Sequence, residues 1–143
     1  LSLAEAETLF ERLGRRCGLH IGTDVVQRAY DWVGGHPLLL RLFGRSLREA
    51  AMDVPRATEL FLSASDVREL VAGALFVVSQ GFPDTWRTVG SSLREGRVPP
   101  HAPHAESMLA PLRWLGMVNE AGAIPDVYVK LGPMVTPVTH EAA

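Results

Sequence analysis

The sequence has few of the residues and segments that mark several protein classes. Its 143 residues include one cysteine, Cys17, so an internal disulfide is excluded and a reducing compartment is expected. No run of apolar residues approaches the roughly 18 needed to cross a bilayer, and no signal-peptide pattern is present. We therefore expect a cytoplasmic chain with no membrane association.

Lysine is nearly absent, because Lys130 is the single lysine among 14 basic residues. The 16 acidic residues give a net charge of −2, which argues against a dedicated polyanion-binding protein, since phosphate contacts need a surplus of positive charge. An apolar content of 47% and a charged content of 21% are typical of a globular chain. The richness in arginine, alanine and glycine suggests a GC-rich bacterial genome.

The motifs of a catalytic nucleotide site are also missing. There is no Gly-x-x-x-x-Gly-Lys-Ser/Thr loop to hold a triphosphate, and no apolar strand that ends in an acidic pair to hold magnesium. A nucleophile elbow, Gly-x-Ser-x-Gly, is absent as well. We expect no enzyme activity from this chain alone. Because it begins at Leu1, already at a helix start, we expect it to be a segment of a larger protein.

Helical periodicity predicts a first module, residues 1–63, made of four helices. Ser2 and Glu5 form a capping-box pattern at the start of the first helix. The third helix is heavily apolar and is expected to lie at the centre of the bundle. The helices are expected over residues 3–17, from Thr23 to the Gly34-Gly35 pair, from Pro37 onward, and over 56–62.

Residues 64–143 are expected to form a second module, a winged helix. Three helices are expected over 66–80, 83–93 and 104–116, the first of them capped by Asp66 with Glu69. A hairpin-like turn at 117–122 and a β-branched strand at Val127-Tyr128-Val129 complete the order of that fold. The expected fold class is therefore mainly α: a four-helix lid-like bundle followed by a winged helix-turn-helix with a small β-hairpin.

The most informative string is Gly34-Gly35-His36-Pro37-Leu38, between the second and third helices. The glycines allow backbone to pass close to another group, and the proline places a rigid apolar ring at a helix N-terminus. That geometry suits a flat ring stacked on Pro37, with the first helical N–H groups favouring negative charge nearby. A corner between two helices with nothing bound explains the same residues.

Gly35-His36-Pro37-Leu38 resembles the Gly-x-Pro motif of the signal-transducing (STAND) NTPases of the AAA+ class. These include the apoptotic and plant disease-resistance NTPases and the archaeal-type ATPases. In that group the motif lies in a helical lid that follows the nucleotide-binding core. The segment Leu1-Ser2-Leu3-Ala4-Glu5-Ala6 is similar to the one that leaves the last core strand. The order of lid and winged helix also matches, so the resemblance covers nearly the whole chain.

The resemblance implies that Pro37 stacks on the adenine of ATP or ADP, that Gly35 permits close approach, and that Leu38 lines the base pocket. His36 stands at the variable position of the motif, and we expect it to make at most a polar contact. The catalytic machinery would then lie in a core upstream of this chain. The winged helix of the family often carries a Met-His-Asp phosphate sensor, which has no counterpart here, since His140 lies in Val-Thr-His-Glu.

Arg41, Arg45 and Arg48 recur at i, i+4 and i+7 and so share one face of the third helix. A lid arginine reaches the γ-phosphate in AAA+ proteins, and the resemblance gives Arg41 this role. The favoured interpretation of the three arginines is instead a solvated face opposite the leucines, in which Arg45 pairs with Glu49.

Several other residues are assigned no ligand. His101 and His104 lie three apart in a proline-rich stretch without convergent partners, so no metal site is expected. The lone cysteine and the three tryptophans are each expected to pack in the core: Cys17, Trp32, Trp86 and Trp114.

Two hypotheses of function follow. In the first, the chain is a regulatory segment of a bacterial signalling ATPase, in which the lid closes over adenine and moves the winged helix against the NTPase core or an oligomeric neighbour. In the second, it is a transcription regulator whose winged helix reads DNA while the first bundle dimerises. Residues 64–143 carry six basic and eight acidic groups, and the helix that would enter the groove has Arg113 as a basic residue and Glu106 as an acidic one. Contact with protein is therefore favoured over contact with DNA.

Overall fold

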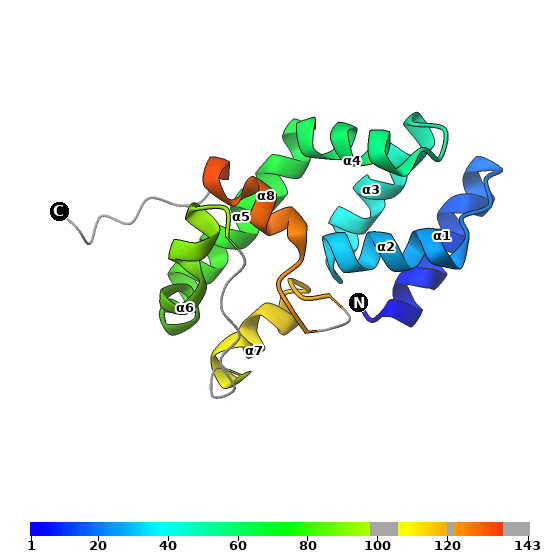
Figure 1. Ribbon diagram of the computed structural model, residues 1–143. Helices are drawn as coiled ribbons and strands as arrows, with labels where there is room; N and C mark the ends of the chain where they lie inside the picture. Colours follow the sequence, from blue (N-terminus) through cyan, green and yellow to red (C-terminus); the bar gives the residue numbers. More distant parts are fainter. Residues whose placement is uncertain (98–105, 120–121, 136–143) are drawn as a thin grey trace.

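The computed structural model describes residues 1–97, 106–119 and 122–135, and the described residues contain eight helices (Figure 1). No residue within these ranges lies in a β-strand. Among the same residues, no helix has the length and apolar character required to span a membrane. The helices are α1 (Leu3–Cys17), α2 (Thr23–Val33), α3 (Pro37–Glu49), α4 (Val54–Ser63), α5 (Ser65–Gly81), α6 (Pro83–Arg94), α7 (Glu106–Trp114) and α8 (Asp126–Val135).

The four helices predicted for residues 1–63 are confirmed. The Glu5 backbone nitrogen donates to Ser2 Oγ at 3.2 Å, and the Ser2 nitrogen donates to Glu5 Oε1 at 3.0 Å, so the capping box that starts α1 is present. Gly18, in the left-handed conformation with φ +68°, ends this helix. The α1 bounds therefore follow from local sequence alone.

Helix α3 lies at the centre of the first module, as its leucine content predicts. Leu39, Leu40, Phe43 and Leu47 are all fully or almost fully buried. Phe43 also belongs to an aromatic cluster with Trp32 of α2 and Phe61 of α4, whose ring centroids lie 5.4–5.8 Å apart. This cluster fixes α3 against its two neighbours in the chain.

The second module begins as predicted and ends differently. Helices α5, α6 and α7 occur in the expected order, but the strand predicted at Val127–Val129 is wrong because these residues lie in α8. The buried residues Val127, Tyr128, Leu131 and Gly132 recur at helical spacing and pack against α2, α5 and α6. A three-residue alternation was too short to distinguish a strand from a helix whose conformation depends on tertiary contacts.

The turn predicted before that strand does exist. Within the described residues, the Asn119 nitrogen donates to the Ala123 carbonyl at 2.9 Å, and the Gly122 nitrogen donates to the Asn119 carbonyl at 3.0 Å. It leads into α8 rather than into a strand. The winged-helix hairpin is therefore not confirmed, while the mainly helical character of the fold is.

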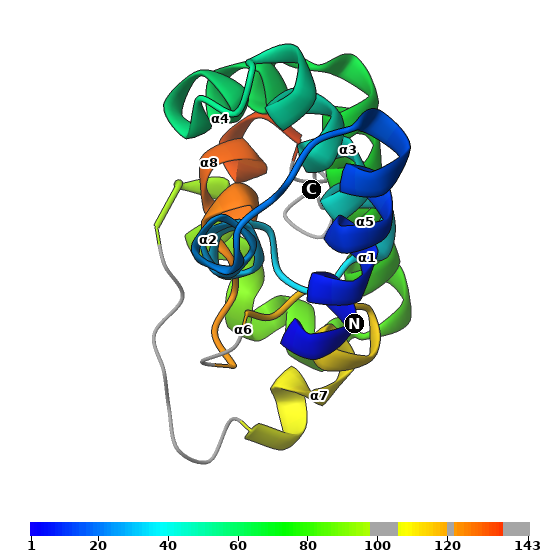
Figure 2. The same ribbon diagram turned by 90° about the vertical axis from the view of Figure 1, so that its right-hand side faces the viewer.

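Helix α8 unites the two predicted modules in one core. It contacts α2 of the first module as well as α5 and α6 of the second, and Figure 2 shows it beside α2. A would-be Cβ on Gly132 would lie 2.2 Å from the Leu93 carbonyl oxygen, so α8 and α6 touch backbone to backbone. Buried residues from both modules belong to a single hydrophobic cluster.

Two residues predicted to be core are on the surface. Trp114 is 74% exposed at the end of α7, where its ring makes an edge-to-face contact with that of Phe82 at a centroid distance of 6.3 Å. Cys17 is exposed at the end of α1. Both lie in the last turn of their helices. By contrast, Trp86 is buried and Trp32 is half-buried, as expected.

Candidate functional site

The site predicted from the sequence begins at the corner between α2 and α3. Gly34 ends α2 with φ +86°, a conformation that L side chains rarely adopt. A Cβ added to it would lie 2.6 Å from Pro125 Cγ and 2.9 Å from the Val118 carbonyl oxygen. Glycine is therefore required here because the segment between α7 and α8 passes directly over the corner.

Gly35 is buried between two backbone segments. Its nitrogen donates to the Val118 carbonyl at 3.2 Å, and its carbonyl accepts from the Leu1 nitrogen at 2.8 Å. A Cβ on Gly35 would lie 2.3 Å from the Leu1 carbonyl oxygen, which also accepts from the Tyr30 hydroxyl at 2.8 Å. The close neighbour that the glycine pair accommodates is thus the chain's own backbone, which explains the pair without a ligand.

His36, Pro37 and Leu38 form the start of α3. His36 is the N-cap, and its Nδ1 accepts from the Leu39 nitrogen at 3.4 Å. Burial lowers the pKa of His36 and favours the neutral imidazole, which can accept this bond. Pro37 is exposed and Leu38 is 49% exposed, so the first turn of α3 presents an apolar surface outward. Pro37 is therefore accessible from solvent, whereas Gly35, two residues before it, is buried.

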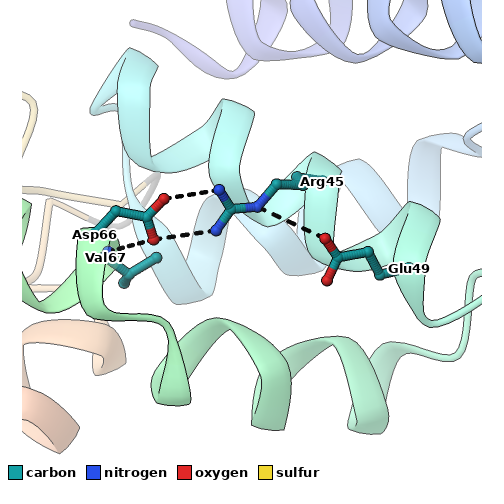
Figure 3. Close-up of polar contacts among 4 residues, drawn as sticks. All are labelled: Arg45, Glu49, Asp66 and Val67. Carbon is teal, nitrogen blue, oxygen red and sulfur yellow. Dashed lines mark hydrogen bonds and ion pairs between the residues drawn. The ribbon is translucent and has the colours of Figure 1, made fainter.

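Arg45 is held by acidic neighbours. Its Nη1 and Nη2 donate to the two carboxylate oxygens of Asp66 at 2.7 and 3.1 Å, and its Nε lies 4.0 Å from Glu49 (Figure 3). The hydrogen bonds from Arg45 lower the pKa of Asp66, and the same bonds raise that of Arg45. The predicted partner Glu49 is thus secondary. Asp66, predicted as an N-cap of α5, instead joins α5 to α3, and Ala64 holds the cap position.

Arg41 and Arg48 differ from Arg45. Both are exposed, and neither has an ion pair or hydrogen bond to any residue in the described part of the chain. Arg41 lies four residues after Pro37 and so on the same face of α3. All three arginines line a crevice of about 160 Å³ between α1 and α3. The other residues around it are Leu13, Gly14, Cys17, Leu19, Ile21 and Gly44.

A second, wider cleft of about 400 Å³ lies between α1 and α2, on the other side of the loop 18–22. Leu19 and Ile21 line both openings. In the wider cleft Arg15 forms an ion pair with Glu11, while Glu7 and His20, which also line it, have no ion pair or hydrogen bond to any described residue. Its lining therefore carries both acidic and basic side chains, unlike that of the crevice.

The remaining predicted residues lie away from this region or outside the described ranges. His101, His104 and His140 lie outside them. Within the described residues, no three His, Cys, Asp or Glu side chains are grouped so as to hold a metal ion. Arg113 is exposed near the end of α7. The α7–α8 turn is fastened to α2 by Asn119, whose side-chain amide donates to the Asp31 carbonyl at 3.3 Å.

The sequence did not predict the crevice between α1 and α3. The arginine spacing was visible, but the apolar floor depends on Leu19 and Ile21, which a loop folds back beside the end of α1. The Leu19 nitrogen donates to the Gly14 carbonyl at 2.8 Å, and a Cβ on Gly14 would lie 2.5 Å from the Leu19 carbonyl oxygen. A glycine inside an otherwise apolar helix face was the one signal available.

Comparison with protein-family models, with curated proteins and with solved structures returns no match. The accessible first turn of α3 and the basic face that continues from it are therefore the basis for assigning a function.

Proposed function

We propose that this chain is the lid and adjoining helical module of a bacterial STAND-like, AAA+-type P-loop ATPase. In this proposal the first turn of α3 faces the adenine of ATP or ADP held in an upstream core. Pro37 stacks on the base, and Leu38 lines its pocket. The observation that carries the proposal is the accessible Pro37–Leu38 pair at the N-terminus of α3, within the Gly35-His36-Pro37-Leu38 motif.

The backbone behind this turn supports such a role. Gly35 is fixed on both sides by hydrogen bonds, to Leu1 and to Val118, so Pro37 is held in one position before any ligand arrives. Preorganisation of this kind lowers the entropy lost on binding. His36 is favoured as neutral by burial, which suits a polar contact to a base rather than an ion pair.

An arginine for the phosphates is available one turn further along α3. Arg41 lies roughly 6 Å beyond Pro37 along the helix axis, given a rise of about 1.5 Å per residue. It has no acidic partner in the described residues, whereas Arg45 is engaged by Asp66. In the proposal Arg41 is therefore the arginine that approaches the phosphates. Catalysis itself belongs to the upstream core, and this chain contributes no hydrolytic group.

The packing also supports transmission of nucleotide state. The corner that carries Pro37 contacts the α7–α8 segment. Gly34 lies against Pro125, and the Gly35 nitrogen donates to the Val118 carbonyl. Helix α8 in turn packs on α5 and α6. A displacement of the corner would thus move the second module as a rigid body against the NTPase core or an oligomeric neighbour.

The rival role in DNA reading has less support. Helix α7 corresponds to the predicted groove-entering helix, and its sequence carries one basic residue, Arg113, and one acidic residue, Glu106. The described residues contain no strand that could form a wing. No observation on the second module favours phosphate contacts over protein contacts.

Photo-crosslinking of the full-length protein tests this proposal. With 8-azido-ATP, label is expected on the peptide that contains Pro37 and Leu38. Label confined to other peptides would remove the adenine-facing role. The full-length gene gives a second test, since the proposal requires a phosphate-binding loop within about 200 residues upstream, roughly one domain length.

A further inference from the structure

The crevice between α1 and α3 is a built feature of the helix packing. Gly44 brings α3 against α1, because a Cβ there would lie 3.0 Å from Leu13 Cδ1 and 3.4 Å from Phe10 Cε1. Beyond this contact the two helices leave an opening whose apolar wall comes from Leu13, Leu19 and Ile21, all half-buried. An apolar recess is thus open to solvent beside a row of arginines.

The charges around the crevice have one sign. Its lining contains three arginines and no acidic residue. The nearest carboxylates by contact, Asp66 and Glu49, both face Arg45, and the α1 carboxylate Glu11 pairs with Arg15. Arg41 and Arg48 therefore remain without a counter-charge among the described residues. The complementary ligand combines an apolar group with negative charge on either side of it.

The size of the crevice decides between classes of ligand. At about 160 Å³ it falls below the roughly 300–1,000 Å³ of typical small-molecule and cofactor pockets. It is large enough for one leucine or phenylalanine side chain. This is the dimension of an anchor pocket at a protein interface, where one buried apolar residue is surrounded by a polar rim.

We propose that this crevice docks an acidic segment of a partner protein, with one large apolar side chain inserted against Leu13, Leu19 and Ile21. Carboxylates that flank this side chain in the segment pair with Arg48, because Arg41 is assigned to the nucleotide phosphates in the proposed function. The Arg45–Asp66 ion pair holds α3 and α5 in place without competing for the segment.

This site is separable from the nucleotide-facing turn. Arg48 lies eleven residues after Pro37, roughly 16 Å along the helix, so it is out of reach of a base stacked on the proline. Arg41 lies between the two sites and is unsuitable for telling them apart. Arg48 is therefore the residue to test.

The test measures binding of a fluorescein-labelled peptide, Glu-Asp-Glu-Glu-Phe-Glu-Asp-Glu-Gly, by fluorescence anisotropy at low ionic strength. Arg48→Glu should weaken binding roughly tenfold or more through charge reversal, and Arg48→Gln by a smaller factor. Arg28 is an exposed arginine on α2 that lines neither opening. Arg28→Glu changes the net charge by the same amount as Arg48→Glu, but it should alter the affinity for the peptide less than about twofold. Replacing the peptide's phenylalanine with serine should also weaken binding roughly tenfold.

Cys17 reports where the peptide lies. It is exposed and lines the crevice, so bound peptide should slow its alkylation by N-ethylmaleimide. Equal losses from Arg48→Glu and Arg28→Glu would show non-specific charge attraction and overturn the proposal. Equal binding of the phenylalanine and serine peptides, or unprotected Cys17, would overturn it as well. So would the absence of binding at protein concentrations up to about 1 mM.

Discussion

Arg45 on α3 and Asp66 at the start of α5 form a bidentate ion pair, with nitrogen–oxygen distances of 2.7 and 3.1 Å (Figure 3). Asp66 Oδ1 also accepts from the Val67 nitrogen at 2.9 Å. The pair spans the connection between the two predicted modules and joins them directly. It therefore adds a polar link between the two parts of the chain to the apolar contacts made by α8.

A double-mutant cycle with Arg45→Gln and Asp66→Asn should give a coupling free energy of about 0.5 kcal/mol at neutral pH. The value is small because the two side chains are 42% and 47% exposed and solvent screens the pair. Because the pKa of Asp66 in the folded state lies below its ordinary 3.8, this stability is present above pH 3.8 and is lost as pH falls through the lowered value. Urea denaturation at a series of pH values measures both effects. A coupling that persists unchanged well below pH 3.8 would contradict the assignment.

Gly34→Ala should lower the free energy of unfolding by about 2 kcal/mol or more. The substitution places an L side chain at φ +86° and drives its Cβ into Pro125 and the Val118 carbonyl. Gly73→Ala is the matched control, because it lies within α5 with nothing within 4 Å of the added Cβ, and it should gain about 0.5–1 kcal/mol. Similar unfolding midpoints in urea for the two variants would refute the close packing at the corner.

Tyr128→Phe should raise the free energy of unfolding by about 1 kcal/mol. The Tyr128 hydroxyl is fully buried and has no hydrogen-bond partner among the described residues, and burial raises the pKa of this group. Tyr30→Phe is the counterpart, since the Tyr30 hydroxyl donates to the Leu1 carbonyl, and it should lose about 1 kcal/mol. Chemical denaturation compares the two. A loss of stability in Tyr128→Phe would mean that this hydroxyl has a partner.

The helices could be predicted from the sequence wherever local chemistry specifies them. The capping box at Ser2, Gly18 at the end of α1 and Pro37 at the start of α3 each mark a boundary that the structure confirms. The conformation of Val127–Val129 could not be predicted from local sequence, because this short β-branched run is helical through its burial against α2, α5 and α6.

The candidate site was predictable in part. The sequence indicated that Gly34 and Gly35 permit a close approach, but it could not show that Leu1 and the α7–α8 segment are what approaches them. The spacing placed three arginines on one face of α3. Their separate roles depend on Asp66, which is 21 residues away from Arg45 in sequence and lies on another helix.

The central claim, that the first turn of α3 faces adenine, is tested most directly by the nucleotide affinity of the full-length protein carrying Pro37→Ala. Pro37→Ala removes two ring methylenes from the contact with the base, which should weaken ATP and ADP binding roughly tenfold at about 0.8 kcal/mol per buried CH₂. Phe76→Ala removes another exposed apolar side chain, on α5, and should leave affinity unchanged. Equal affinities of Pro37→Ala and the unmodified protein, measured by isothermal titration calorimetry, would contradict the claim.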